Sequence, residues 1–452
     1  MSWNAAYALL LLSATVVTYV GGMIIQSLKD RGAIFGQKIT LAICLTINLG
    51  VLCVFKYLGM LVSCLNRVLS MIHFPELAMN WNIILPVGIS FFTLQSIGYL
   101  IDVYREEISA EKNIVTYALF VSFFPQLVAG PIERSKNLLI QLKKQVSFRY
   151  EYFQKGLFWI LYGLMIKMVI ADNLAVFVDL VFTDPATYAG WYIIAATFAF
   201  AIQIYCDFYG YSIIAKGSAY LLGIELMSNF EAPYFSRSVK EFWRRWHISL
   251  STWFRDYVYI PLGGSKRGEV RRNTNLLIVF LVSGLWHGAS IAFVFWGMLN
   301  GVYQVIGNTF SRIVKHENKI MLFCRRFFKP LFTFCLIAFT WIPFRAGSWS
   351  ETKKIISCMI SGISKYGVIK LMNIQSFWDT MPIKTVNGVI LGIMILGVVD
   401  FMKHKNISVI DGLVKQGIWF RYIVIVFLVL FILSFGCYGE SYNPAQFIYF
   451  QF

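Results

Sequence analysis

Histidines are the side chains in this sequence best suited to acid–base chemistry, and there are only five of them. His316 and His404 stand beside lysines, which is typical of solvated loops. His73 precedes a Phe-Pro pair at a turn, where an imidazole at the membrane interface is the simplest interpretation. This leaves His247 and His287 as candidates for chemistry.

His287 lies inside a long apolar stretch, in the sequence Ser-Gly-Leu-Trp-His-Gly-Ala-Ser of residues 283–290. An ionisable side chain at membrane depth is a candidate functional residue. If the segment is helical, Ser283, Gly284 and Ser290 share the face of the imidazole and let another molecule approach closely. The competing interpretation is helix packing, because the segment also carries a Gly-x-x-x-Gly motif. These residues alone leave both interpretations open.

His247 lies in the aromatic and basic segment 241–256. At helical spacing it shares an apolar face with Trp243, Leu250 and Phe254. An interfacial helix with an aromatic belt is the alternative to a functional role. The arginines of the segment serve either as anchors for lipid headgroups or as clamps for the phosphates of a cofactor.

The soluble catalytic motifs are missing from the sequence. It contains no Gly-x-Ser-x-Gly nucleophile elbow, no phosphate-binding loop and no paired Cys or His-Glu-x-x-His metal site. We therefore predict no metal site, and no cofactor-binding residue can be assigned. A neutral imidazole that accepts the proton of an alcohol, while the alcohol oxygen attacks an activated acyl carbonyl, is the simplest enzymatic hypothesis.

The composition places these residues in a membrane. Hydrophobic residues make up 58% of the 452 residues and charged residues only 14%, against about a quarter charged in soluble proteins. This excludes a disordered chain and argues against a soluble enzyme. The net charge of +17 comes from basic residues in short loops, which favours a cytoplasmic membrane face over nucleic acid. The predicted fold class is an all-α polytopic membrane protein with a single membrane domain, residues 1–452.

Several stretches approach the ~20 apolar residues that a spanning helix needs. They are 5–25, 40–62, 83–101, 113–130, 156–172, 190–206, 276–306, 327–345, 385–401 and 420–438. Proline, glycine or charge interrupts them at 86–88, 125–131 and 207–217. Broken helices at membrane depth predict an internal lumen. We expect Asp207 to pair with a cation or to cap such a break.

An ordered set of motifs runs through nearly the whole chain. It consists of Ser-Phe-Phe-Thr at 90–93, Asp-Val-Tyr-Arg at 102–105, Phe-Pro-Gln-Leu-Val-Ala-Gly-Pro-Ile at 124–132, Arg-Arg-Trp-His-Ile-Ser-Leu at 244–250, Asp-Tyr-Val-Tyr-Ile-Pro-Leu-Gly-Gly at 256–264, Trp-His-Gly at 286–288 and Phe-Ile-Tyr-Phe-Gln-Phe at 447–452. In these motifs the sequence resembles the membrane-bound O-acyltransferase (MBOAT) family, in particular its bacterial alginate O-acetyltransferase branch.

The resemblance implies a multi-helix bundle with broken or re-entrant helices around a central tunnel, in which His287 is the catalytic base and His247 a second tunnel residue. It implies acetyl-CoA or a similar cytoplasmic thioester as a co-substrate, with no bound cofactor. The acetyl group would pass outward for O-acetylation of an exported or cell-surface polysaccharide. The implied location is the bacterial cell membrane. The implied partners are a serine-hydrolase-like extracytoplasmic acetyltransferase, the polysaccharide biosynthesis machinery and the lipid bilayer, and not nucleic acid.

The chain departs from this family pattern in two ways. The first hydrophobic segment usual in the family is expected to be missing, and Ile213 and Lys216 stand where relatives carry an acidic and an apolar residue. Alternatives to acetyl transfer are D-alanyl transfer to teichoic acid, a transporter or flippase gated by His287, and a scaffold for polymer secretion.

Overall fold

The computed structural model describes residues 6–77, 86–128, 130–313, 319–366 and 381–438. His316 and the terminal motif 447–452 lie outside the described residues. Helices and short connections make up the described chain, which contains no β-strand. The chain divides into two compact units, Met1–Ser147 and Phe148–Phe452, and each is described by itself.

The first unit is built on two long helices, α1 and α2, that both contact each other and α3. Its helices are α1 (Ala6–Asp30), α2 (Ile34–Met71), α3 (Ile89–Tyr104), α4 (Ile114–Ser122), α5 (Phe124–Leu127) and α6 (Ser135–Leu142). Nearly every residue of α3 is buried. The break predicted at 125–131 begins where α4 ends, and Pro125 occupies the first turn of α5. At 86–88 the interruption precedes α3, whose N-cap is Gly88 in the left-handed conformation.

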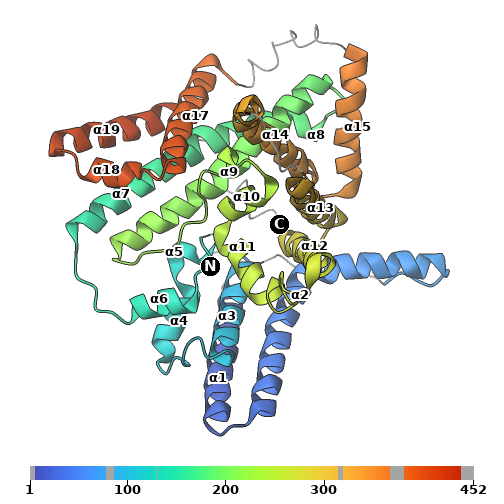
Figure 1. Ribbon diagram of the computed structural model, residues 1–452, viewed down its shortest axis with the longest axis vertical. Helices are drawn as coiled ribbons and strands as arrows, with labels where there is room; N and C mark the ends of the chain where they lie inside the picture. The colour runs from blue at the N-terminus through green and yellow to red at the C-terminus, as the bar shows by residue number, and fades with distance from the viewer. Residues whose placement is uncertain (1–5, 78–85, 129, 314–318, 367–380, 439–452) are drawn as a thin grey trace. The chain divides into compact units, whose positions relative to one another are not determined.

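The second unit holds both candidate histidines. Its helices are α7 (Tyr150–Met165), α8 (Asp172–Thr183), α9 (Gly190–Leu221), α10 (Val239–Arg245), α11 (Ile248–Phe254), α12 (Gly268–His287), α13 (Ile291–Ile313), α14 (Lys319–Ala346), α15 (Trp349–Tyr366), α17 (Ile383–His404), α18 (Val409–Val414) and α19 (Ile418–Phe435). A π-helical turn, Ile166–Ala171, joins α7 to α8. Figure 1 shows α7 beside α9, with α18 and α19 next to α7.

The interruption predicted at 207–217 is wrong, because α9 runs through it unbroken. The glycines there serve close packing against α7 instead. A Cβ on Gly210 would lie 3.0 Å from the carbonyl oxygen of Gly163, and one on Gly217 would lie 2.7 Å from that of Gly156. Two helices whose backbones approach this closely need small residues at the contact.

Asp207 pairs with a cation, as predicted. Its carboxylate lies 2.7 Å from the Nζ of Lys167, which also contacts Asp172. The three side chains are largely buried between α9 and the turn that joins α7 to α8. Asp207 therefore holds helices together, which is an architectural role.

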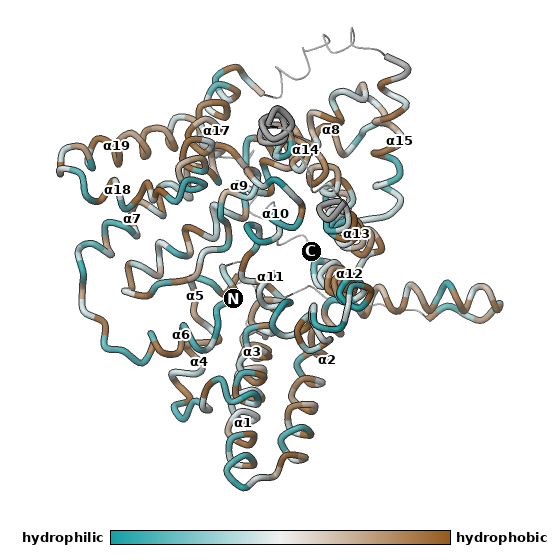
Figure 2. The backbone as a smooth tube through the Cα atoms, viewed as in Figure 1, coloured by the Kyte–Doolittle hydropathy of each residue, from teal (hydrophilic) through white to brown (hydrophobic). Residues whose placement is uncertain are grey.

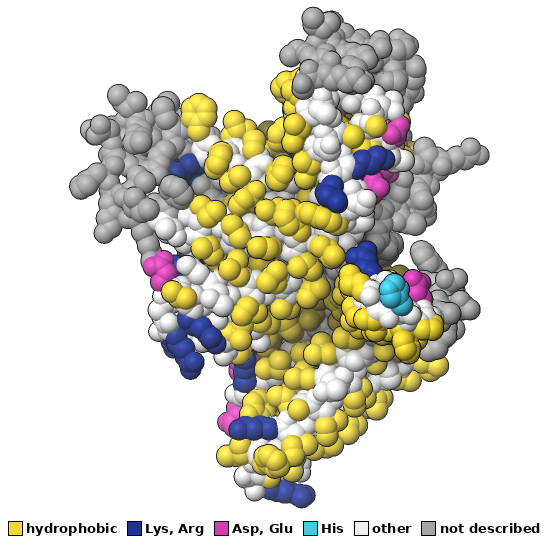
Figure 3. Space-filling view, turned by 90° about the vertical axis from the view of Figure 1, so that its right-hand side faces the viewer, with side chains coloured by type: hydrophobic (Ala, Val, Ile, Leu, Met, Phe, Trp, Pro, Cys, Tyr) yellow, Lys and Arg dark blue, Asp and Glu magenta, His cyan; other side chains and the backbone are white. Residues whose placement is uncertain are grey.

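The surface of several helices is that of a membrane protein. Among the described residues, α1 (from Tyr7), α2, α9, α17 and α19 are long and apolar enough to cross a bilayer. They correspond to the predicted stretches 5–25, 40–62, 190–206, 385–401 and 420–438. In Figure 2 most of α17 and α19 is coloured hydrophobic, and Figure 3 shows a face on which hydrophobic side chains predominate and charged ones are few. The predicted all-α membrane fold class is confirmed.

The predicted stretch 276–306 is wrong as a single helix, because it contains a turn. It covers most of the helical hairpin α12–α13, in which the chain reverses between His287 and Ile291. Gly288 is extended and ends α12. Ser290 starts α13, since its Oγ accepts a hydrogen bond from the backbone N–H of Ala292 at 3.1 Å. Ser290 therefore does not share the helical face of His287, whereas Ser283 and Gly284 belong to the same helix as the histidine.

Candidate active site around two buried histidines

His287 is positioned by the close packing of α12 on α13. A Cβ on Gly284 would lie 2.3 Å from the carbonyl oxygen of Phe293, and one on Gly297 would lie 2.2 Å from that of Phe280. The glycines thus bring the two backbones together, as the packing interpretation of the motif requires. Packing and function do not exclude each other here, because the same contact fixes the last turn of α12, which carries His287.

The imidazole of His287 is enclosed by aromatic rings from three helices. Its ring centroid lies 4.8 Å from that of Trp286, 5.0 Å from that of Trp296 in α13 and 5.2 Å from that of Phe344 in α14. The side chain is only 5% exposed. A group in such a place is shielded from bulk water, which strengthens electrostatic interactions with any reactant that reaches it.

His247 lies between α10 and α11 rather than on a continuous helix. Its backbone is left-handed, with φ 43° and ψ 55°, so the apolar face predicted from helical spacing does not exist. Two backbone hydrogen bonds hold the turn: the N–H of Glu231 donates to the carbonyl of Arg245 and that of Ile248 to the carbonyl of Asn229, each at 2.9 Å. A non-glycine residue kept in this conformation is often found at a functional site.

One indole contacts both histidines. The ring centroid of Trp286 lies 6.1 Å from that of His247 and 4.8 Å from that of His287. On its other side His247 packs against Phe208 of α9, at 4.6 Å between centroids. Burial lowers the pKa of His247 to about 3, so its imidazole is neutral at physiological pH. The structure therefore brings both predicted site residues into one aromatic layer.

A cavity of about 600 Å³ lies beside this layer. Ile248, which follows His247, lines it, and so does Ser283, one helical turn before His287. Neither histidine itself lines the cavity. Hydroxyl and amide side chains make up much of the rest of the wall: Ser251, Thr252, Tyr259, Ser265, Gln304 and Asn308. A molecule in the cavity would thus lie close to the backbone segments that carry both histidines.

The charged side chains that line the cavity are all basic. They are Lys240, Arg244, Arg255 and Arg272. Arg255 also pairs with Asp256 at 2.7 Å, and Arg272 pairs with Glu269 at 2.9 Å. Burial, together with the nearby positive charges of Arg244 and Arg272, lowers the pKa of Lys240. The positive charges at the cavity repel one another, and an anionic ligand would relieve this repulsion.

Sequence reasoning missed the polar contact that ties α10 to this site. The Nε1 of Trp243 donates a hydrogen bond of 3.1 Å to the Oδ1 of Asn300, which is fully buried in α13. Trp243 also packs on Trp296, one of the rings around His287, at 5.5 Å. The sequence did contain a signal for this contact: Asn300 lies inside an apolar stretch, and a buried amide needs hydrogen-bond partners.

The sequence is similar to those of known proteins. Residues 103–345 match the model of the membrane-bound O-acyltransferase family. A Pseudomonas putida protein named "Probable alginate O-acetylase" is 33% identical over 90% of this chain and 83% of its own. A peptidoglycan O-acetyltransferase of Helicobacter pylori is 34% identical over 80% of this chain and 72% of its own.

A more distant relative is a teichoic acid D-alanyltransferase of Streptococcus thermophilus, 30% identical over 52% of this chain and 59% of its own. By their names, the first two relatives transfer an acetyl group to oxygen, and the third transfers a D-alanyl group to teichoic acid. The family match and the long, well-covered similarity to the first two relatives agree with the motifs around His247 and His287. The chain belongs to the membrane-bound O-acyltransferase family and is a membrane O-acyltransferase.

Proposed function

We propose that the protein moves an acetyl group from a cytoplasmic thioester, acetyl-CoA in the simplest case, to a hydroxyl of an exported or cell-surface polysaccharide. The observation that carries the proposal is the placement of His287 in a dry aromatic layer, one helical turn beyond a cavity with four basic side chains. The relatives named for O-acetylation of alginate and of peptidoglycan support a polysaccharide acceptor.

In this proposal His287 is the general base. Its neutral imidazole accepts the proton of the acceptor hydroxyl while the hydroxyl oxygen forms a bond to the thioester carbonyl carbon. The carbon–sulfur bond then breaks, and the departing thiolate takes the proton from the imidazolium. The products are therefore the acetyl ester and the free thiol. The rings of Trp296 and Phe344 keep water away from the carbonyl and so limit hydrolysis.

His247 has a positioning role in the same reaction. Its pKa of about 3 makes it a poor proton acceptor at neutral pH. Its imidazole shares Trp286 with His287, so it fixes the indole that borders the base. The left-handed turn at His247 also sets where α11, which lines the cavity, begins.

The basic cavity is the proposed donor site. The phosphates of a CoA-type thioester carry several negative charges, and arginine forks bind phosphate oxygens in pairs. Arg244 and Arg272 supply such forks at the cavity. The sequence left open whether the arginines of segment 241–256 bind lipid headgroups or phosphates. Two of them, Arg244 and Arg255, line this cavity. No residue is needed to hold a permanently bound group, because the donor enters and leaves in each cycle.

The remaining elements of the proposal follow from the two substrates. A charged thioester stays in the cytoplasm and the polymer lies outside, so a tunnel through a single membrane domain, residues 1–452, would let the thioester and an acceptor hydroxyl reach His287 from opposite sides in a multi-pass protein of the bacterial cell membrane. A serine-hydrolase-like acetyltransferase outside the membrane would complete delivery to the polymer, next to the polymer's biosynthesis machinery.

The test is loss of O-acetyl groups from the surface polymer in a strain that carries H287A or H287N. We expect acetate released by mild base to fall to the level of the deletion strain, while the amount of protein in the membrane is unchanged. H73N, at an exposed histidine of the first unit, is the matched control and should retain wild-type acetylation. Wild-type acetate content in the His287 variants would reject the assignment.

D-alanyl transfer is the second candidate function, because a teichoic acid D-alanyltransferase is among the relatives. It would use the same base and a carrier-protein thioester. Ester-linked D-alanine and acetate, measured in parallel in the envelope of a deletion strain, separate the two. Loss of D-alanine with unchanged acetate would overturn acetyl transfer.

A further inference from the structure

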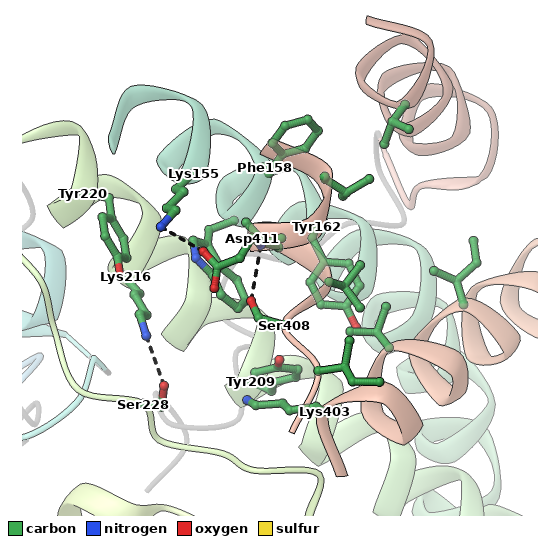
Figure 4. A pocket seen from close by; sticks show the side chains of 18 of the residues that line it. Lys155, Phe158, Tyr162, Tyr209, Lys216, Tyr220, Ser228, Lys403, Ser408 and Asp411 are labelled. Carbon is green, nitrogen blue, oxygen red and sulfur yellow. Dashed lines mark hydrogen bonds and ion pairs between the residues drawn. The ribbon is translucent and has the colours of Figure 1, made fainter. Parts of the chain in front are cut away.

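A second large cavity of the Phe148–Phe452 unit is not used by the proposed reaction. It has a volume of about 650 Å³ and lies between α7, α9, α17, α18 and α19 (Figure 4). Among its lining residues is Lys216. Two of the helices around it, α17 and α19, are candidate membrane spans. The cavity therefore borders the region that lipid occupies.

The charges of this cavity balance. Three lysines and three carboxylates line it: Lys155, Lys216, Lys403, Glu225, Glu231 and Asp411. This differs from the donor cavity, where every charged lining residue is basic. A cavity with equal numbers of both signs does not select an anion by its net charge. It suits a ligand that carries one charge of each sign.

A carboxylate and an ammonium group both contact the side chain of Tyr220. Tyr220 donates its hydroxyl proton to Glu225 at 2.9 Å, and the Nζ of Lys216 lies over the same ring, 5.9 Å from its centroid. Lys216 also donates to the hydroxyl of Ser228 at 3.1 Å and lies 5.6 Å from the ring centroid of Trp159 (Figure 4). The ammonium and the carboxylate are therefore fixed near each other.

The other two lysines are committed to the protein. Lys155 pairs with Asp411 at 2.8 Å and with Glu151 at 2.9 Å. Lys403 donates to the carbonyl oxygen of Phe230 at 2.5 Å. These contacts stabilise the polar part of the wall. Lys216 and Glu225 are hydrogen-bonded to the neutral hydroxyls of Ser228 and Tyr220, and a ligand phosphate and ammonium would be stronger partners than these hydroxyls.

The opposite wall is apolar and reaches the surface. It consists of Ile395, Val399, Leu413, Val424, Phe427 and Leu428. Phe427 lines the cavity and is nevertheless 47% exposed, and its neighbours Ile423 and Leu430 on α19 are more than half exposed. An acyl chain could leave the cavity along these exposed apolar side chains of α19. A small soluble ligand would leave the apolar wall bare.

We propose that this cavity binds a phospholipid with a zwitterionic headgroup of the phosphoethanolamine class. Its phosphate lies at Lys216, its ammonium at Glu225, and one acyl chain runs along α19. The proposal is independent of the reaction assigned to His287. It gives a role to a lysine that lies within a helix long and apolar enough to cross a bilayer.

The experiment is native mass spectrometry of the full-length protein in detergent, titrated with dioleoyl phosphatidylethanolamine, dioleoyl phosphatidylglycerol or soluble phosphoethanolamine. We expect the wild type to retain phosphatidylethanolamine about tenfold more tightly than phosphatidylglycerol, since a charged hydrogen bond distinguishes them. K216M should weaken both lipids, because it removes the phosphate partner. E225Q should abolish the preference between them, because it removes only the ammonium partner.

Two substitutions outside the cavity are matched controls. K405M and E351Q remove the same charges from exposed positions of the same unit and should leave both affinities unchanged. Equal retention of the two lipids by the wild type would overturn the proposal, even if a variant cannot be purified. Displacement of phosphatidylethanolamine by an equal concentration of soluble phosphoethanolamine would overturn it as well, in favour of a soluble phosphorylated amine.

Discussion

Gly284 of α12 lies directly against Phe293 of α13, so that a Cβ on the glycine would come within 2.3 Å of the phenylalanine carbonyl oxygen. The obstacle is backbone and cannot rotate away. G284A must therefore separate the two helices and move His287, which follows one turn later. We expect the free energy of unfolding to fall by about 1–3 kcal/mol and acetylation per folded molecule to fall by more than tenfold, because small displacements of a catalytic group are costly.

The matched control for G284A is G307A in α13. A Cβ at Gly307 meets no atom within 4 Å, and alanine favours a helix over glycine. For G307A, the thermal unfolding temperature in detergent should be at or slightly above the wild-type value, and acetate release should be unchanged. If G284A and G307A behave alike, the contact between Gly284 and Phe293 does not position the histidine.

Arg244 allows a separate test of the donor cavity. R244Q removes a cation that lines it, and we expect the KM for acetyl-CoA to rise about tenfold with kcat nearly unchanged. Acetyl-pantetheine, which lacks the phosphates, should show the same KM with both proteins. The control is R237Q, an exposed arginine that does not line the cavity. An equal rise of KM for both donors would show that Arg244 does not contact a phosphate.

The fold class could be predicted because apolar length and composition dominate in a membrane protein. Turns inside apolar segments were harder to predict. Residues 276–306 exceed the length of one span, yet the reversal depends on Gly288 and Ser290, two small residues that are also common within spanning helices. The opposite error occurred at 207–217, where glycines suggested a break but serve the contact between α7 and α9. The sequence alone does not show whether a glycine allows a turn or allows a neighbouring helix to pack closely.

The two histidines were found because few ionisable residues lie in apolar or aromatic surroundings. Their environment could not be predicted in the same way. His247 was placed on a helical face by its spacing, but the turn there is held by residues about 15 positions earlier, including Asn229 and Glu231. Such long-range backbone hydrogen bonds leave no local pattern. The basic cavity likewise gathers Lys240 and Arg244 from α10, Arg272 from α12 and Arg255 from the π-helical turn Arg255–Tyr259.

His247 should make stability depend on pH. A histidine in an unfolded chain takes up a proton near pH 6.5, whereas the buried His247 has a pKa of about 3. Between these values the unfolded chain binds more protons, so the free energy of unfolding falls as the pH is lowered. We expect H247N, in which asparagine tolerates the left-handed backbone, to lose about 2 kcal/mol less stability than the wild type between pH 7 and pH 5. Chemical unfolding at the two pH values measures this, and equal losses would show that His247 is hydrated.

The buried group formed by Lys167, Asp172 and Asp207 should matter for folding and not for chemistry. D207N leaves Lys167 with one charged partner in a poorly hydrated place, so we expect the free energy of unfolding to fall by about 1–3 kcal/mol. Acetylation per folded molecule should stay within twofold of the wild type. E351Q on the surface of α15 is the control and should change neither quantity. A D207N protein that is as stable as the wild type but inactive would instead give Asp207 a role in positioning His247, since its neighbour Phe208 packs against that histidine.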